Sequence, residues 1–198
     1  MTDRLDLRRR LHELAFRQAG YVSAAQALKV GYSYQAQKYH VDRGNWIKVD
    51  RGMFRLAEWP STPGDVYARW TVWSESRGVV SFQSAASVHG LGDFISRQVH
   101  LTLLRARPRT NGVMLHWARL EDDDVEDHGT YRVTTPTRTL LDLASEDVSQ
   151  GQFLVAVQGA LSSGQVDEDA LIRHMDGMGS RAATRLRRAI DSVTANGD

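Results

Sequence analysis

The stretch that decides the fold of the first part of the chain is GYSYQAQKYHVDRGNWIKVDRGMFRL, residues 31–56. Ser33 can cap a helix over residues 34–43, and Gly44 stands where helices often end. The strand-like runs WIKVD and MFRLA follow, joined around Gly52, where glycine can adopt the positive φ that a tight hairpin needs. The stretch therefore predicts a short helix followed by a β-hairpin.

Upstream of this stretch, apolar spacing and caps predict two further helices. Leucines recur at helical spacing between residues 6 and 19. Ser23 can cap a second, short helix, AAQALKV, which Gly31 would end. Two short helices separated by a turn of about three residues form a helix-turn-helix. With the hairpin behind it, this pattern predicts a winged helix-turn-helix.

The stretch EWPSTPG, residues 58–64, holds two of the four prolines and predicts a linker. We place a domain boundary there, between a winged helix-turn-helix domain over residues 1–58 and a mixed α/β domain over residues 59–198. In the second part, strand patterns such as QVHLTLL and GVMLHW come before a run of helical patterns that Thr135 opens. The predicted fold class is α+β, with a helical C-terminal end.

The formal net charge of +1 conceals an asymmetry between the two parts of the chain. Residues 1–58 hold 11 lysines and arginines against 6 aspartates and glutamates, a net charge of +5. Residues 59–198 hold 14 against 18, a net charge of −4. A small basic module beside a larger acidic one is typical of a protein whose first part meets a polyanion.

The helix over residues 34–43 must bury one side and offer the other to the major groove of DNA. The buried side is expected to hold Ala36, Gln37, His40 and Val41. The exposed side carries residue types that can bond bases or phosphates, and Lys48 and Arg51 add positive charge near the hairpin tip. The residues predicted to contact DNA are Ser33, Tyr34, Gln35, Lys38, Tyr39, Arg43, Lys48 and Arg51.

Two arginine-rich segments of the second part are candidates for a secondary basic patch. One is the turn RARPRTNG between two predicted strands, and the other is a face of the last predicted helix, residues 180–193. The simpler interpretation is that these arginines form a solvated surface. The more specific interpretation is that they contact nucleic acid or an acidic partner. The residues concerned are Arg105, Arg107, Arg109, Arg181, Arg185 and Arg188.

No assembled catalytic site can be identified in the sequence. A nuclease site needs spaced carboxylates and usually a lysine, yet no lysine follows Lys48. No Asp-x-Asp pair follows Gly179 and Ser180, as a nucleotidyltransferase site would require, and no phosphate-binding loop occurs. The acidic run EDDDVED, residues 121–127, is interpreted as a solvated loop. We predict a protein that is not an enzyme, with no catalytic residue and no cofactor.

The seven histidines show no metal-binding spacing such as H-E-x-x-H. His100 and His116 could face each other on adjacent strands, but no serine in a Gly-x-Ser-x-Gly setting accompanies them. His89 is interpreted as a packing residue at a helix end. The sequence therefore predicts no metal site.

The chain contains no cysteine, which excludes disulfides and thiolate metal sites. No apolar run approaches the roughly 20 residues that a membrane span needs. We therefore expect a cytoplasmic protein that does not associate with membranes.

Three motifs occur in a characteristic order: GNWIKVDRGMFRL at 44–56, SFQSAASVHGL at 81–91 and TTPTRTLLDLA at 134–144. Together they resemble the AbiEi antitoxins of bacterial type IV toxin-antitoxin and phage-abortive systems, over roughly residues 5–145. The resemblance implies a winged helix that binds inverted repeats in its own promoter and represses the operon. It also implies a C-terminal domain that counteracts a co-encoded AbiEii-type nucleotidyltransferase toxin, and it leaves open whether the two proteins touch.

A second hypothesis belongs to another functional class. The winged helix could instead be a protein-interaction module that holds the toxin directly and binds little DNA. Tyr34, Tyr39 and Trp46 are the residues that would suit such a docking surface.

Overall fold

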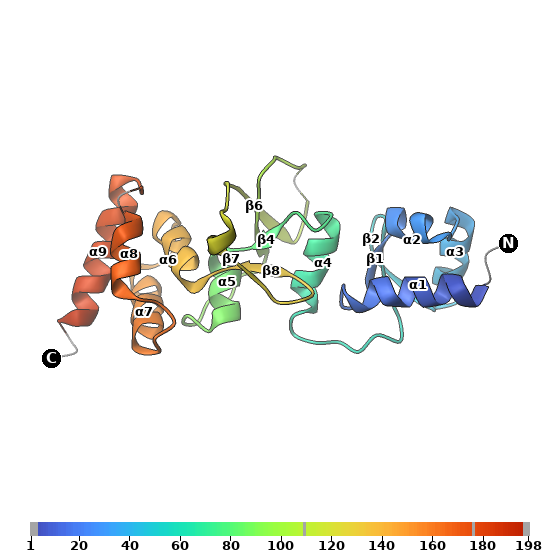
Figure 1. Ribbon diagram of the computed structural model, residues 1–198, viewed down its shortest axis with the longest axis horizontal. Coiled ribbons are helices and arrows are strands. Elements are labelled where there is room, and N and C mark those ends of the chain that lie inside the picture. Colours follow the sequence, from blue (N-terminus) through green and yellow to red (C-terminus); the bar gives the residue numbers. More distant parts are fainter. Residues whose placement is uncertain (1–3, 109, 176, 196–198) are drawn as a thin grey trace. The chain divides into compact units, whose positions relative to one another are not determined.

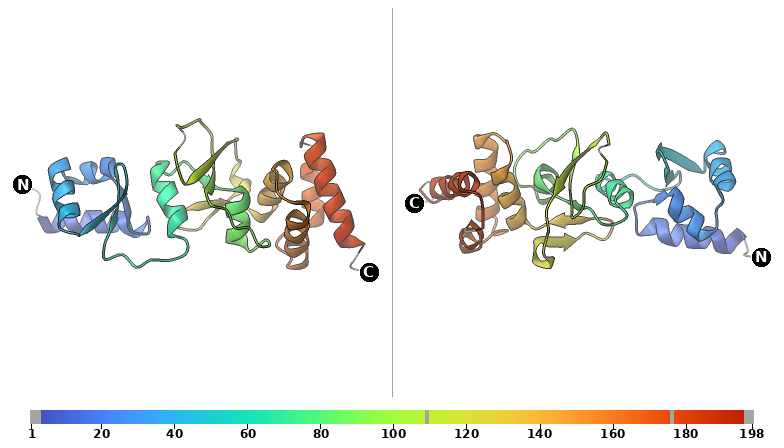
Figure 2. Two further views of the ribbon diagram at one scale, coloured as in Figure 1. Left: turned by 180° about the vertical axis from the view of Figure 1, so that it is seen from behind. Right: turned by 90° about the horizontal axis from the view of Figure 1, so that it is seen from above.

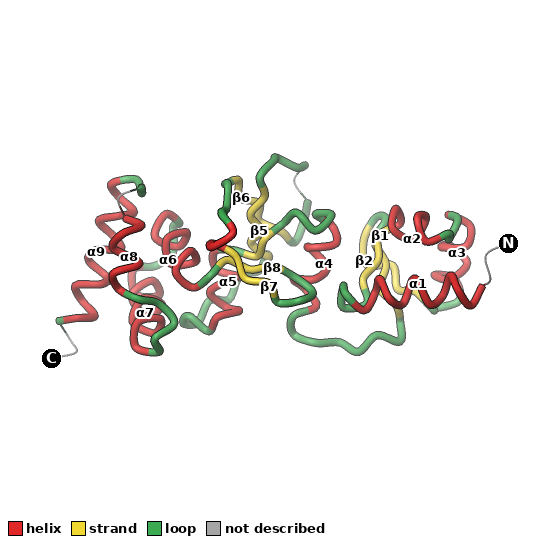
Figure 3. Tube along the Cα trace, in the orientation of Figure 1, coloured by secondary structure: helices red, strands yellow, loops and turns green. Residues whose placement is uncertain are grey.

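The computed structural model describes residues 4–108, 110–175 and 177–195, and these residues form helices and two separate sheets (Figures 1 and 3). The chain divides into two compact units. The first extends to Gly78 and includes His128–Tyr131, and the second comprises Val79–Asp127 and the residues from Arg132 onward. The mixture of helices and strands confirms the predicted α+β class.

The first unit begins with three helices and a three-stranded antiparallel sheet. These elements are α1 (Arg4–Phe16), β1 (Tyr21–Ser23), α2 (Ala24–Val30), α3 (Tyr34–Asp42), β2 (Trp46–Asp50) and β3 (Met53–Leu56). The strand order is β1-β3-β2, so the β2–β3 hairpin is extended by the short strand between α1 and α2. The helices and the hairpin lie where the sequence predicts them. The sequence does not predict β1, because three residues are too few to show an alternating pattern.

Caps and turns account for the boundaries of α2 and α3. The Ser23 hydroxyl accepts a hydrogen bond from the Gln26 main-chain nitrogen at 3.1 Å, and the Gln26 side chain accepts one from the Ser23 nitrogen at 2.9 Å. This reciprocal pair satisfies two donors at the start of α2. Ser33 caps α3 by accepting from the Ala36 nitrogen at 3.2 Å. Gly31, at φ +123°, makes the turn between the two helices.

A small apolar core holds the three helices against the sheet. Its buried members are Leu11, Ala15, Val22, Ala27, Tyr32, Trp46, Phe54 and Leu56. They come from all three helices or the turns beside them and from all three strands. Packing in this core therefore fixes α3 relative to the hairpin.

A second cluster extends the first unit beyond Glu58. Helix α4 (Asp65–Trp73) buries Ala68 and Val72 against Tyr21 and Met53 of the sheet. Asp65 at its start also pairs with Arg55 of β3. The compact unit thus includes the first helix after the proline-rich linker. The division at Glu58 into two functional domains stays a prediction.

The second unit contains a mixed five-stranded sheet. Its strands are β4 (Val79–Val80), β5 (Val99–Leu103), β6 (Val113–Trp117), β7 (Val125–Asp127) and β8 (Arg132–Thr134). In the order β6-β5-β4-β8-β7, the pairs β5–β6 and β4–β8 are parallel and the other two are antiparallel. The acidic run at 121–127, predicted as a loop, forms the 3-10 helix η1 (Asp122–Asp124) and β7, because its backbone pairs with β8.

Helices follow the sheet in the second unit, as predicted. Helix α5 (Phe82–His89) lies between β4 and β5, and the helices that follow the sheet are α6 (Pro136–Ser145), α7 (Gln150–Ser162), α8 (Glu168–Met175) and α9 (Ser180–Thr194). The last four pack together, orange to red in both views of Figure 2, around Leu143, Phe153, Leu171 and Leu186. The Thr135 hydroxyl caps α6 at the predicted position, with Pro136 in the first turn.

Within the described residues, no helix is both long and apolar enough to cross a bilayer.

Candidate functional site

Helix α3 and the β2–β3 hairpin form the candidate nucleic-acid interface, and the phase of α3 decides which side chains it presents. Gln37 is only 2% exposed. Its amide donates to the main-chain oxygens of Ala24 at 3.1 Å and Tyr32 at 3.0 Å. A buried amide bonded in this way has no capacity left to bond another molecule through its donors. The buried side of α3 is thus the predicted one, with Ala36, His40 and Val41 half-buried.

The opposite side of α3 is open to solvent. Tyr34 is 69% exposed and Tyr39 is 54% exposed, and Gln35 and Lys38 lie between them on the exposed surface. The Lys38 Nζ atom lies 2.6 Å from Asp42 Oδ2, one turn along the helix. The Asp42 carboxylate therefore pairs with the lysine, and the Arg43 guanidinium lies 5.5 Å from the centre of the Tyr39 ring.

Aromatic packing joins α3 to β2. The His40 ring stacks on the Trp46 indole, with ring centres 5.0 Å apart and planes within 13°. Burial lowers the pKa of His40, so the imidazole is neutral near pH 7 and suited to this apolar contact. Asn45 Nδ2 also lies 3.2 Å from His40 Nδ1. The helix and the hairpin are therefore fixed to each other.

The hairpin presents two exposed cationic side chains, Lys48 and Arg51. A register shift between Lys48 and Asp50 bends β2 just before the turn. The Asp50 carboxylate is bonded within the protein, because it accepts hydrogen bonds from the Arg51 main-chain nitrogen at 2.6 Å and from the Arg69 side chain at 3.0 Å. The negative charge nearest the hairpin tip is thus partly neutralised by Arg69.

The candidate secondary patches differ in what their arginines contact. Arg105 is exposed and Arg107 half-buried in the segment after β5, whereas Arg109 lies outside the described residues. Arg181 and Arg188 are exposed on α9.

Arg185, predicted to share the exposed face with them, has a different role. Its guanidinium donates to the main-chain oxygens of Glu146 and Val148 and lies 4.6 Å from the centre of the Phe153 ring. The prediction that Arg185 belongs to a free basic face is corrected by these contacts, because the same donors hold the turn between α6 and α7.

The motif residues of the second unit bind one another. His89 Nε2 lies 2.7 Å from the Thr134 main-chain oxygen, which connects the motif at 81–91 with the motif at 134–144. Arg138 pairs with Asp142 at 2.8 Å and with Asp124 at 2.9 Å. These motifs therefore contribute to packing and internal ion pairs, in line with the interpretation of His89 as a helix-end residue.

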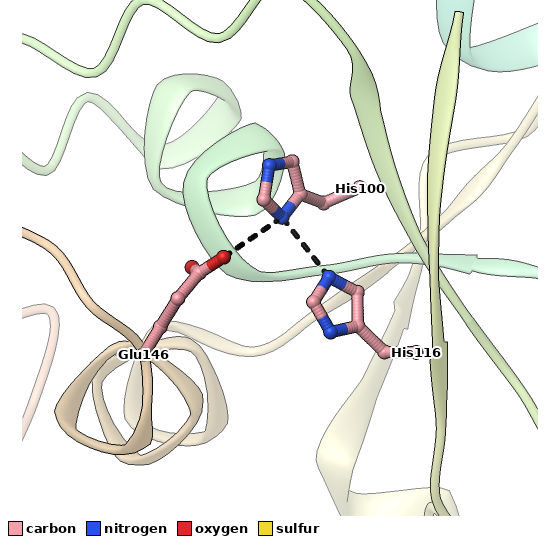
Figure 4. Close-up of side chains that lie close together, drawn as sticks. All are labelled: His100, His116 and Glu146. Carbon is pink, nitrogen blue, oxygen red and sulfur yellow. Dashed lines mark hydrogen bonds and ion pairs between the residues drawn. The ribbon is translucent and has the colours of Figure 1, made fainter. Parts of the chain in front are cut away.

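His100 and His116 lie side by side on the parallel strands β5 and β6, as the sequence allowed (Figure 4). His100 Nδ1 is 3.0 Å from His116 Nε2 and 3.5 Å from Glu146 Oε1. Burial lowers the pKa of both imidazoles to about 4, so both are neutral at pH 7. Sequence reasoning missed Glu146, because nothing in the spacing of the residues indicates that the end of α6 returns to these strands.

Comparisons with known proteins give a family and a fold. Residues 78–192 match the model of a family described as the AbiEi antitoxin C-terminal domain. The chain is also similar to the crystal structure of the RV2827C protein from Mycobacterium tuberculosis, with a TM-score of 0.64 and 14% sequence identity. That likeness covers 97% of this chain and 78% of the other, and at this identity it shows a common fold. A search of curated proteins finds no match.

Proposed function

The chain belongs to the AbiEi antitoxin family, and from this premise we propose that it is the DNA-binding antitoxin of a type IV toxin-antitoxin system. In this proposal residues 1–58 form a winged helix-turn-helix that binds inverted repeats upstream of the operon and represses it. Residues 59–198 counteract a co-encoded AbiEii-type nucleotidyltransferase toxin. The protein acts by binding, without catalysis.

The observation that carries the DNA-binding part is the phase of α3. Because Gln37 is turned into the protein, Gln35 and Lys38 lie on the exposed side together with two tyrosines. An α-helix with its side chains is about 10–12 Å across, and the major groove is about 12 Å wide and admits such a helix. An amide can bond adenine in two places, and lysine can bond guanine or phosphate. The exposed surface of α3 thus supports a role as a recognition helix.

The hairpin supports the same function. Lys48 and Arg51 are exposed on a turn that aromatic packing ties to α3. Positive charge on such a turn suits a phosphate or the minor groove. Two copies of the chain on an inverted repeat would place two recognition helices about one helical turn of DNA apart.

The test is binding to the DNA upstream of the operon at several salt concentrations. Gln35→Ala should relax sequence specificity, whereas Lys38→Ala and Arg51→Ala should each reduce the slope of log K against log salt by roughly 1. Arg187→Ala removes an exposed charge from α9 of the other unit and is the control. If all three variants bind as the wild type does, this surface does not contact DNA.

The alternative is a protein-interaction module that holds the toxin directly with little DNA binding. Exposed Tyr34 and Tyr39 favour it, since tyrosine is frequent at binding hot spots. Trp46, which we expected to join them, is 4% exposed and belongs to the core, so it cannot take part. Co-purification of the toxin without any shift of operator DNA would favour this alternative.

A further inference from the structure

The buried cluster of His100, His116 and Glu146 has the donor set of a metal site. Two imidazole nitrogens and one carboxylate oxygen lie within 4.8 Å of one another. Two ligands of a tetrahedral Zn²⁺ ion, each about 2.0–2.1 Å from the metal, are about 3.3 Å apart. The two distances from His100 Nδ1, 3.0 Å to His116 and 3.5 Å to Glu146, bracket that value. We propose that these three residues bind a single Zn²⁺-class transition-metal ion.

The first turn of α5 is built around this cluster. The Phe82 ring stacks on the His116 imidazole, with centres 3.7 Å apart and planes within 16°. Gln83 hydrogen-bonds the Glu146 carboxylate. The Ser84 hydroxyl accepts from the His100 main-chain nitrogen at 2.9 Å. Three consecutive residues therefore each contact a different member of the cluster.

Phe82 supports this arrangement with an uncommon backbone conformation. Its φ of +51° lies in the left-handed region, which bulky residues rarely adopt. The strain is retained at the residue whose ring covers His116.

Glu146 is held through its main chain. As the residue that ends α6, its main-chain oxygen accepts from Arg185. Within the part of the chain that the structure describes, its Oε2 atom is buried without a hydrogen-bond partner. A buried carboxylate oxygen without a partner is destabilised when ionised, and a bound cation would relieve this cost. Arg185 thus fixes the main chain at Glu146, whose carboxylate lies 3.5 Å from His100 Nδ1.

The ligand types decide which cation the site would take. Imidazole suits Zn²⁺ and its first-row neighbours, whereas Mg²⁺ and Ca²⁺ prefer oxygen ligands alone. Three protein ligands leave a fourth position, which water would fill. Bound metal would connect the end of α6 to β5 and β6, so it should stabilise the second unit. This inference is independent of DNA binding.

The test uses the full chain without a polyhistidine tag, after chelator treatment and dialysis. Zn²⁺ should bind by calorimetry at one ion per chain, and a several-fold excess should raise the melting temperature by several degrees. Co²⁺ should give the intense visible absorption of a four-coordinate ion. Mg²⁺ should produce neither effect.

The variants His116→Gln and Glu146→Gln should each weaken Zn²⁺ binding roughly 100-fold or more and abolish the Co²⁺ spectrum. His174→Gln, which changes an exposed histidine on α8, and Glu13→Gln on α1 are the matched controls and should bind as the wild type does. Circular dichroism checks that each variant folds. Absence of one-to-one binding in the wild type, or wild-type binding by both ligand variants, would overturn the proposal.

Discussion

The side-chain amide of Gln37 donates a hydrogen bond of 3.0 Å to the main-chain oxygen of Tyr32, the residue just before the cap of α3. A polar side chain thus lies in the core at a position where an apolar one would be expected. Its second bond, to Ala24 at the start of α2, ties together the two helices of the predicted helix-turn-helix. The orientation of the exposed surface depends on these bonds.

Gln37→Ala should therefore lower stability, whereas Gln35→Ala should lower DNA binding. The first removes a donor that serves two main-chain oxygens, which should lower the free energy of unfolding by about 1–3 kcal/mol. The second changes an exposed residue, so stability should change by less than about 0.5 kcal/mol while operator binding weakens. Chemical denaturation and fluorescence anisotropy measure the two quantities. Equal stability of the two variants would contradict the described phase of α3.

Replacement of Arg185 tests its internal role against a role in a free basic patch. Arg185→Met keeps the length of the side chain but removes the bonds to Glu146 and Val148. We expect the free energy of unfolding to fall by about 1–3 kcal/mol, toward the lower end of this range because the Arg185 side chain is partly exposed to solvent.

Arg188→Met, at an exposed position on the same helix, is the control and should be close to neutral. Thermal melts of both variants decide the matter. Two equally stable proteins would restore Arg185 to the candidate basic patch.

The sequence predicts the local features of this fold well, because their causes are local. Ser23, Ser33 and Thr135 each cap the helix that follows them, and a cap can be identified from neighbours three residues away. The side of α3 that is buried also follows from its own periodicity. Helical spacing even indicates that Arg185 shares a face with Arg181 and Arg188, but it cannot say what that face meets.

The features that the sequence does not predict arise from contacts between distant segments. Glu146 meets His100 only because α6 ends beside β5, some 46 residues along the chain. The strand β1 exists because β3 offers it a partner, since its three residues carry no pattern of their own. Candidate DNA-binding residues could thus be chosen within one helix and one hairpin, whereas the approach of Glu146 to the two histidines required the structure.

A side chain at Gly31, in the turn between α2 and α3, should destabilise the fold. A Cβ atom there would lie 2.7 Å from Leu7 Cδ2, and φ is +123°, which other residues rarely adopt. Gly31→Ala should therefore cost about 2 kcal/mol or more.

Gly44→Ala is the control, because its φ of +73° is also positive but a Cβ atom at this position would have no neighbour within 4 Å among the residues that the structure describes. It should cost only about 1 kcal/mol. Urea denaturation of both variants gives the comparison. A larger loss for Gly44→Ala would show that neither the φ of Gly31 nor the approach to Leu7 decides the cost.

The acidic side chain of Asp142 should make stability fall as the pH rises from about 4 to 7. Burial raises the pKa of Asp142 from 3.8 to about 6, against the opposing influence of Arg138. In the described residues, its Oδ2 atom is buried without a hydrogen-bond partner, so the ionised form is poorly solvated. The native state holds the Asp142 proton more tightly than the unfolded chain does. The stability that this protonation contributes is therefore fully present below the pKa of the unfolded chain, and it is lost as the pH rises through the pKa of the folded protein.

Asp142→Asn isolates this contribution, because asparagine stays neutral and still offers an oxygen to Arg138. The wild-type unfolding free energy minus that of the variant should decrease by at most about 3 kcal/mol between pH 4 and pH 7. Asp123→Asn, at an exposed position in η1, controls for the loss of an acidic group. Denaturation at closely spaced pH values measures the difference. A difference that rises with pH would mean that the ion pair with Arg138 outweighs burial, and that Asp142 is ionised throughout this range.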